Sequence, residues 1–276
     1  MTSDENKLKP IVVYLACKPL GIGKFQNFIK NYKYFDSGQD HDLLICFKQF
    51  DNYDEVNLWK KEISLKFIDY HDKFIENDYD IGSYLRIAKS YPKRNILFIG
   101  THTIPNKKNW LKIFVNHYSS KRLLGATGSW ASLASQLLNF EYSQHTIFQQ
   151  IRWGLIHFFK VKLFPNPHIR TTGFFINTDD LISIKVNTSK LVKKIETNYF
   201  EAGRNSLSNQ LVKKGYELII VNSDNEAFKM NEWNKSKTFF LNNQEKLIFT
   251  DNKTNEYSKA SDDTKKTMTK SHWGRN

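Results

Sequence analysis

The sequence has few cysteines and no long apolar run. Cys17 and Cys46 are its 2 cysteines, and both lie in apolar, strand-like segments rather than in a Cys-x-x-Cys pair, so neither a disulfide framework nor a zinc site is predicted. The longest apolar run, Ile11 to Cys17, is far shorter than the roughly 20 residues of a membrane-spanning helix. Because residues 1–7 are polar and partly acidic, unlike a secretory signal, we expect a cytoplasmic protein.

Several common catalytic motifs are also absent. The sequence contains no Walker loop, GxGxxG, HExxH or GxSxG, which excludes the usual forms of kinases, dinucleotide enzymes, zinc proteases and serine hydrolases. It has no internal repeat, low-complexity tract or linker, so we expect a single domain over residues 1–276.

The chain is basic but has the composition of a folded protein. It has 41 Lys+Arg against 28 Asp+Glu, a formal charge of +13, with 40% hydrophobic and 14% aromatic residues. Such a field attracts nucleic acid, an anionic membrane or anionic small molecules. The basic residues are scattered rather than gathered in a block, so no nucleic-acid partner is expected.

The first part of the chain has the pattern of a strand, a helix and a second strand. Ile11 to Cys17 is a continuous apolar run typical of a strand buried on both faces. Apolar residues from Phe25 to Tyr32 recur at helical spacing, and Leu43 to Phe47 is a second buried strand. This βαβ unit predicts a parallel sheet covered by helices.

The alternation continues along the chain and predicts an α/β fold with a mostly parallel central sheet. In such sheets ligands bind at the carboxyl ends of the strands, so the loops after Cys17, Phe47 and Ile99 should face one common site. The further strands are expected at Leu65–Ile68, Asn95–Ile99, Gly173–Asn177 and Leu218–Val221, and the further helices at Gly82–Tyr91, Ile147–Phe159 and Asn205–Lys214.

Asp80 and Gly82 lie where the chain enters a predicted helix. The Asp80 side chain could cap the N–H groups of the first turn, or it could bind ligand hydroxyls or the edge of a base. Gly82 would allow backbone to approach a ligand closely. The pattern leaves both interpretations open.

Charged residues flank the later strands. His168 and Arg170 are two apart beside a core strand, so both side chains should point to the same side, where Arg170 could hold a phosphate or be a surface cation. Glu201 and Arg204 lie three apart at an expected helix start, after aromatic residues. Glu201 is either a partly desolvated general base or one half of a surface ion pair.

Read together, these segments resemble the GT-A-fold glycosyltransferases, in particular the family-2-like and rhamnan-synthesis-like enzymes of bacterial surface polysaccharide biosynthesis. Tyr79 to Tyr84, followed by Asn95 to Ile99, is similar to the family's helix start and metal-motif strand. His168 to Ile176 is similar to its acceptor-side strand, and Phe200 to Tyr216 to the acidic helix that supplies the base.

The resemblance implies a GT-A fold and hexosyl or deoxyhexosyl transfer from a nucleotide-sugar donor to a polysaccharide or lipid-linked acceptor of the cell envelope. It gives Glu201 the role of catalytic base, with inversion at the anomeric carbon. Residues 234–276 become a C-terminal extension packed on or near the active site, and peripheral contact with the inner membrane face is a further expectation. The donor-binding residues that it implies are Lys18, Asp80, Gly82, Thr101, His102, Arg170, Arg204 and His272.

The sequence departs from the family pattern in two places. The Asp-x-Asp motif that holds Mg²⁺ or Mn²⁺ should follow the strand ending at Ile99, but Gly100 to Pro105 contains no carboxylate. The family's Glu-Asp pair would fall at Gly203-Arg204, two residues after Glu201.

The missing Asp-x-Asp predicts no protein metal site. Either transfer is metal-independent, with Arg, Lys and His in place of the cation, or the protein is a catalytically inactive glycosyltransferase-like protein that binds sugar or nucleotide. Use of a divalent cation stays open, and a basic nucleic-acid-binding protein is the third hypothesis.

Overall fold

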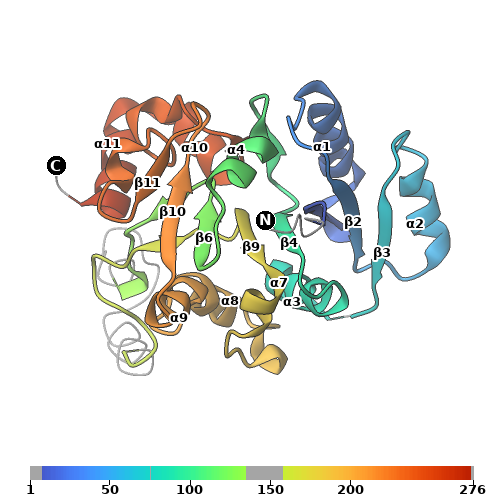
Figure 1. Ribbon diagram of the computed structural model, residues 1–276, viewed down its shortest axis with the longest axis horizontal. Coiled ribbons are helices and arrows are strands. Elements are labelled where there is room, and N and C mark those ends of the chain that lie inside the picture. The colour runs from blue at the N-terminus through green and yellow to red at the C-terminus, as the bar shows by residue number, and fades with distance from the viewer. Residues whose placement is uncertain (1–7, 75, 135–157, 275–276) are drawn as a thin grey trace, which may run out of the picture.

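The computed structural model describes residues 8–74, 76–134 and 158–274, and an eight-stranded sheet runs through its centre (Figure 1). In spatial order the strands are β11 (Ala227–Lys229), β10 (Glu217–Val221), β6 (Arg122–Gly125), β9 (Gly173–Asn177), β4 (Asn95–Ile99), β1 (Ile11–Cys17), β2 (Asp42–Lys48) and β3 (Ile68–Asp72).

The sheet is mixed but mostly parallel. β1 pairs in parallel with β2 and β4, β2 with β3, and β10 with β6, whereas β9 and β11 pair antiparallel to their neighbours. The expected α/β fold with a mostly parallel central sheet flanked by helices is therefore confirmed.

Helices cover both faces of the sheet because its central strands are apolar on both sides. In β1, Ile11, Val13 and Leu15 belong to one buried cluster, and Val12 and Tyr14 belong to the other. The first face is covered by α3 (Tyr79–Ser90), α7 (Thr178–Ile182), α8 (Lys194–Ala202) and α9 (Leu207–Lys213). The second is covered by α1 (Ile22–Tyr34), α2 (Tyr53–Lys60) and α4 (Trp110–His117).

The C-terminal segment is folded onto the body of the protein. β12 (Phe249–Thr250) pairs with β5 (Ile104–Pro105), and α10 (Asn252–Lys259) and α11 (Asp262–Trp273) follow it. Trp273 is buried, and its indole N–H donates to the Phe239 carbonyl at 2.8 Å. The remaining short elements are the β7–β8 pair (Gly128–Ser129 with His168–Ile169) and single 3-10 turns at Lys18–Leu20, Thr188–Lys190, Trp233–Lys235 and Asn242–Gln244.

Several element boundaries differ from the sequence prediction. The strand expected at Leu65–Ile68 begins only at Ile68, and the helix expected from Gly82 begins at Tyr79. Most of the helix expected over 147–159 lies outside the described residues, and its last two residues, Phe158 and Phe159, are exposed in a turn. Among the described residues, no helix combines the length and apolar character needed to cross a lipid bilayer.

Candidate active site

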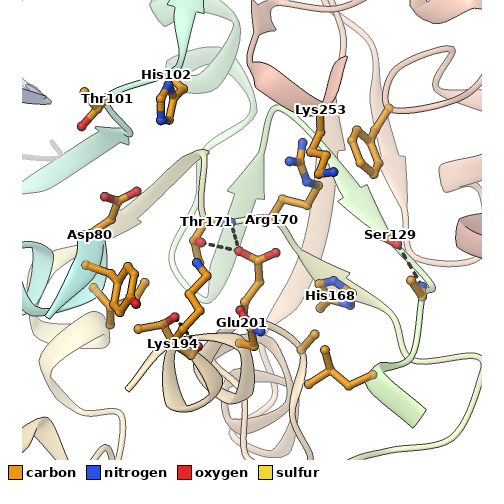
Figure 2. A pocket seen from close by; sticks show the side chains of 18 of the residues that line it. Asp80, Thr101, His102, Ser129, His168, Arg170, Thr171, Lys194, Glu201 and Lys253 are labelled. Carbon is orange, nitrogen blue, oxygen red and sulfur yellow. Dashed lines mark hydrogen bonds between the residues drawn. The ribbon is translucent and has the colours of Figure 1, made fainter. Parts of the chain in front are cut away.

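A cavity of about 690 Å³ opens at the carboxyl ends of the parallel strands (Figure 2). Cys17 at the end of β1, Gln49 after β2 and Thr101 after β4 all line it, so the prediction that these three loops share one site is confirmed. The helices α3 and α8 and the C-terminal segment close the other sides.

Glu201 lies in the last turn of α8, and its side chain lines the cavity. The sequence prediction placed Glu201 at the start of the following helix, which begins instead at Leu207. Its Oε2 atom accepts hydrogen bonds from the Thr171 backbone N–H at 3.1 Å and from the Thr171 hydroxyl (Figure 2). Since these bonds occupy one oxygen, Oε1 is the oxygen that can take a proton from a ligand.

Asp80 is the second acidic group of the cavity. It does not cap α3, because the N-cap position is Asp78 and neither side chain bonds to the first-turn N–H groups. Burial raises the pKa of Asp80, since it penalises the charged form. The nearby Lys194 and Lys48 oppose that rise, and no hydrogen bond to Asp80 is found among the described residues.

A buried ion network lies behind Asp80. Lys48 is 1% exposed and bonds to the Asp78 carboxylate and, at 3.0 Å, to the Ser83 hydroxyl. Arg86 bonds to Asp78 and to Asp72, each at 2.6 Å. These bonds fix the loop before α3 and the first turn of that helix.

Arg170 is a nearly buried cation of the cavity, 7% exposed. Its guanidinium lies 2.9 Å from Asp251 Oδ2 and is stacked 3.9 Å from the centre of the Phe239 ring. Asp251 also caps α10 by accepting from the Thr254 N–H at 2.8 Å. Although burial opposes it, the Arg170 charge and this cap hold the pKa of Asp251 below its usual range.

His168 and His272 line the same cavity, which confirms that His168 and Arg170 face one side. The Nδ1 atom of His168 lies 2.8 Å from the Asn166 carbonyl, and that of His272 lies 3.0 Å from the Met268 carbonyl. Burial lowers the pKa of both rings, that of His272 to about 4. Each ring is thus neutral at pH 7, and because Nδ1 must donate to a carbonyl, Nε2 is left as an acceptor.

The loop after β4 supplies polar groups without a carboxylate. Thr101 and His102 line the cavity. The Thr101 hydroxyl and His102 Nδ1 are buried, and neither has a hydrogen-bond partner in the described part of the chain. Burial also lowers the pKa of His102. Across the described ranges, no group of three or more His, Cys, Asp or Glu side chains could hold a metal ion. The loop after β4 thus offers a hydroxyl and an imidazole where a carboxylate motif was expected.

Three of the residues expected to bind the donor do not line the cavity. Lys18 is paired at the surface with Asp51 and, at 2.7 Å, with Glu55. Arg204 is exposed beyond the end of α8. Gly82 is buried against the ion network, where an added Cβ would lie only 1.6 Å from Asp78 Oδ2.

The sequence did not predict several residues that line the cavity. Lys194 comes from the first turn of α8, where its Nζ lies 4.8 Å from the Tyr79 ring centre, and Lys253 comes from the first turn of α10. Phe239 also lies on the cavity wall. The Asp251-x-x-Thr254 capping box was the one local signal for α10, and it could have located Lys253.

Comparison with known proteins gives only distant matches. No family model matches the sequence, and no curated protein matches it. Among solved structures, HddC from Yersinia pseudotuberculosis is 12% identical with a TM-score of 0.37, covering 63% of this chain and 79% of that one. A galactosyltransferase, LgtC, in complex with donor and acceptor sugar analogues is 10% identical with a TM-score of 0.43, covering 77% of this chain and 73% of that one.

Core-mannan synthase A from Aspergillus fumigatus, in its Mn/GDP form, is 6% identical with a TM-score of 0.39 over 78% of this chain and 72% of that one. The likeness to these three structures is distant and gives no specific family. No substrate or mechanism follows from likenesses at this level.

Proposed function

We propose that this protein is a glycosyltransferase that moves a hexosyl or deoxyhexosyl group from a nucleotide-sugar donor to a saccharide or lipid-linked acceptor. The observation that carries the proposal is the composition of the cavity. The Glu201 carboxylate, whose Oε1 accepts no hydrogen bond from the described residues, lines the same space as the cations Arg170, Lys194 and Lys253. A base for a hydroxyl group and positive charge for a diphosphate are what sugar transfer requires.

In the proposed reaction, Glu201 Oε1 takes the proton of an acceptor hydroxyl. The hydroxyl oxygen then forms a bond to the anomeric carbon while the bond from that carbon to the diphosphate oxygen breaks. The nucleoside diphosphate leaves with the electron pair, and Arg170, Lys194 and Lys253 stabilise its charge. One displacement inverts the anomeric carbon, so the product should have the opposite configuration to the donor.

Several donor contacts follow from the cavity wall. Asp80 would bind nucleoside hydroxyls. Thr101 and His102 would bind the donor in place of the missing carboxylate motif, since their buried polar atoms have no hydrogen-bond partner among the described residues. His272 Nε2 would accept a hydrogen bond from a hydroxyl group of the donor. Because Gly100 to Pro105 supply no carboxylate to hold a cation on the diphosphate, we propose metal-independent transfer.

The C-terminal extension, residues 234–276, would complete this site. Phe239, Lys253 and His272 all belong to it and line the cavity. As an enzyme of cell-envelope polysaccharide synthesis, the protein would work in the cytoplasm, with peripheral contact to the inner membrane face when its acceptor is lipid-linked.

A thermal-shift panel of UDP-, GDP-, CMP- and dTDP-sugars, each with and without Mn²⁺, tests donor binding. A ligand that binds only the folded state raises the melting temperature by mass action. We expect one nucleotide class to raise it without metal. No shift with any of them would refute the proposal, and steeply salt-dependent binding to generic DNA or RNA would then favour the nucleic-acid hypothesis.

Glu201→Gln tests the chemistry. It should remove turnover while donor binding persists, because the amide keeps the shape but cannot accept the proton. Glu196→Gln is the matched control, since Glu196 lies on the same helix but pairs with Lys160 outside the cavity. Unchanged turnover in Glu201→Gln, or a product with retained configuration, would exclude Glu201 as the base. Donor binding without any turnover in the wild type would identify a catalytically inactive binding protein.

A further inference from the structure

Two residues with left-handed backbone line the cavity, one in the loop after β2 and one where the chain enters α3. Gln49 has a φ of 57° and Tyr79 has a φ of 52°, and both line the cavity. Left-handed backbone is uncommon for residues other than glycine and costs of order 1 kcal/mol or more, so it persists where the surroundings or the function require it. The sequence assigned no role to either side chain, and the reaction proposed above uses neither.

The Gln49 side chain is oriented by Cys17. Burial raises the pKa of the Cys17 thiol to about 11, so the group is protonated at neutral pH and can act as a donor. Its Sγ lies 3.4 Å from Gln49 Oε1. Because the thiol needs an acceptor, the amide oxygen of Gln49 faces Cys17 and its NH₂ group faces away from that bond.

A backbone hydrogen bond fixes the amide oxygen of Asn77, as the Cys17 thiol fixes that of Gln49. Its Oδ1 atom accepts from the Tyr79 N–H at 3.0 Å, in the turn that leads into α3. Within the described part of the chain, no hydrogen bond from the amide nitrogen of either Gln49 or Asn77 is found. Both side chains line the cavity, so its wall presents two NH₂ groups as donors.

We propose that Gln49 and Asn77 read the nucleobase and favour a base with an exocyclic carbonyl, meaning uracil, thymine or guanine, over one with an exocyclic amine in its place. This inference rests on the proposed function, since it concerns the base of the same donor. An NH₂ group donates to the carbonyl O4 of uracil or O6 of guanine, whereas it meets another donor at N4 of cytosine or N6 of adenine. The Tyr79 ring offers the apolar, flat surface on which such a base can stack.

Isothermal titration of the full chain with UDP, CDP, GDP and ADP tests the proposal. UDP and CDP differ at C4 of the ring, and both carry the same ribose and diphosphate. We expect UDP to bind about tenfold more tightly than CDP, or GDP than ADP, the order of effect of one mismatched hydrogen bond. The pair that binds tells whether the cavity takes a pyrimidine or a purine.

Gln49→Glu and Asn77→Asp test the residues themselves, because each replaces an NH₂ donor by a carboxylate oxygen of the same shape. The readout is the affinity ratio of the two members of a pair, which cancels the effect of the added charge on the diphosphate. We expect at least one variant to reduce that ratio severalfold. Asn57→Asp, on the exposed side of α2, is the control for the added charge and should leave the ratio unchanged.

Two results would overturn the inference. Equal binding of carbonyl and amine bases by the wild type would mean that these amides do not read the base. An affinity ratio that is unchanged in both Gln49→Glu and Asn77→Asp, in samples with the wild-type melting temperature, would also mean that these amides do not read the base. Failure of all four nucleotides to bind would refute the proposed function and this inference together. That outcome differs from failure of the inference alone, in which the nucleotides bind but show no preference for the base.

Discussion

Lowering the pH should destabilise this protein partly through His272. In the folded state its pKa is lowered to about 4, mainly because burial penalises the charged ring and because Arg170 lies nearby. In the unfolded chain the ring has its ordinary pKa of about 6.5. Between these values the unfolded state binds a proton that the folded state does not, so the free energy of unfolding falls as the pH falls.

The size of the effect follows from the difference between the two pKa values. At about 1.4 kcal/mol for each unit, the full contribution is about 3 kcal/mol, reached below pH 4. At about pH 5 the same relation gives a loss of about 2 kcal/mol relative to pH 7.5. His168 and His102 add to the loss, since burial lowers the pKa of both rings as well.

Urea unfolding of the wild type and of His272→Asn, near pH 7.5 and at about pH 5, measures this contribution. Asparagine keeps a donor near the Met268 carbonyl but does not titrate. At pH 7.5 the variant loses only the packing of the ring against Phe239 and Phe240, so the change between the two pH values isolates the titration. The variant should lose about 2 kcal/mol less than the wild type on acidification. An equal loss in both proteins would refute the assignment.

Two substitutions test the packing around the cavity. Gly82→Ala should cost about 3 kcal/mol or more in urea unfolding, because the new Cβ displaces the Asp78 carboxylate from its buried partners, whereas Gly23→Ala, with no atom within 4 Å of its Cβ, should be neutral or stabilising. Asp251→Asn should keep the cap of α10 but leave the Arg170 charge buried and unpaired, lowering stability by about 3 kcal/mol. If Arg170 binds a diphosphate, a nucleoside diphosphate should raise the melting temperature of that variant more than that of the wild type.

The central strands could be predicted from the sequence because they are buried on both faces. Ile11–Cys17, Asn95–Ile99 and Gly173–Asn177 are continuous apolar runs, and the structure has strands with these same bounds. The edge strand β3, Ile68–Asp72, has the sequence Ile-Asp-Tyr-His-Asp and is only half buried. Its apolar signal is weak, and the prediction therefore began in the preceding residues.

The site was predictable only where the strands determine it. The loops after β1, β2 and β4 meet because parallel strands end at one edge, and that follows from the pattern alone. Lys253 belongs to α10, in which Tyr257 is the one large apolar side chain, so no apolar spacing marks that helix. Lys194 is the first residue of α8, and the sequence does not set it apart from the neighbouring Lys190 and Lys193. Arg204 shows the converse, since its spacing from Glu201 suggested a shared site, but α8 ends at Ala202 and Arg204 is exposed beyond it.

The ion network also explains how the chain tolerates a left-handed tyrosine at the wall of the site. Asp78 immediately precedes Tyr79 and is held by Lys48 from β2 and by Arg86 from two turns further along α3. With the residue before it and the helix after it both fixed, Tyr79 has no room to relax to an extended or helical φ. The same constraint fixes the next residue, Asp80, in the first turn of α3 and at the cavity wall. The network, of which Lys48 reaches the cavity wall, would thus set the position of both the ring and the carboxylate that face a ligand.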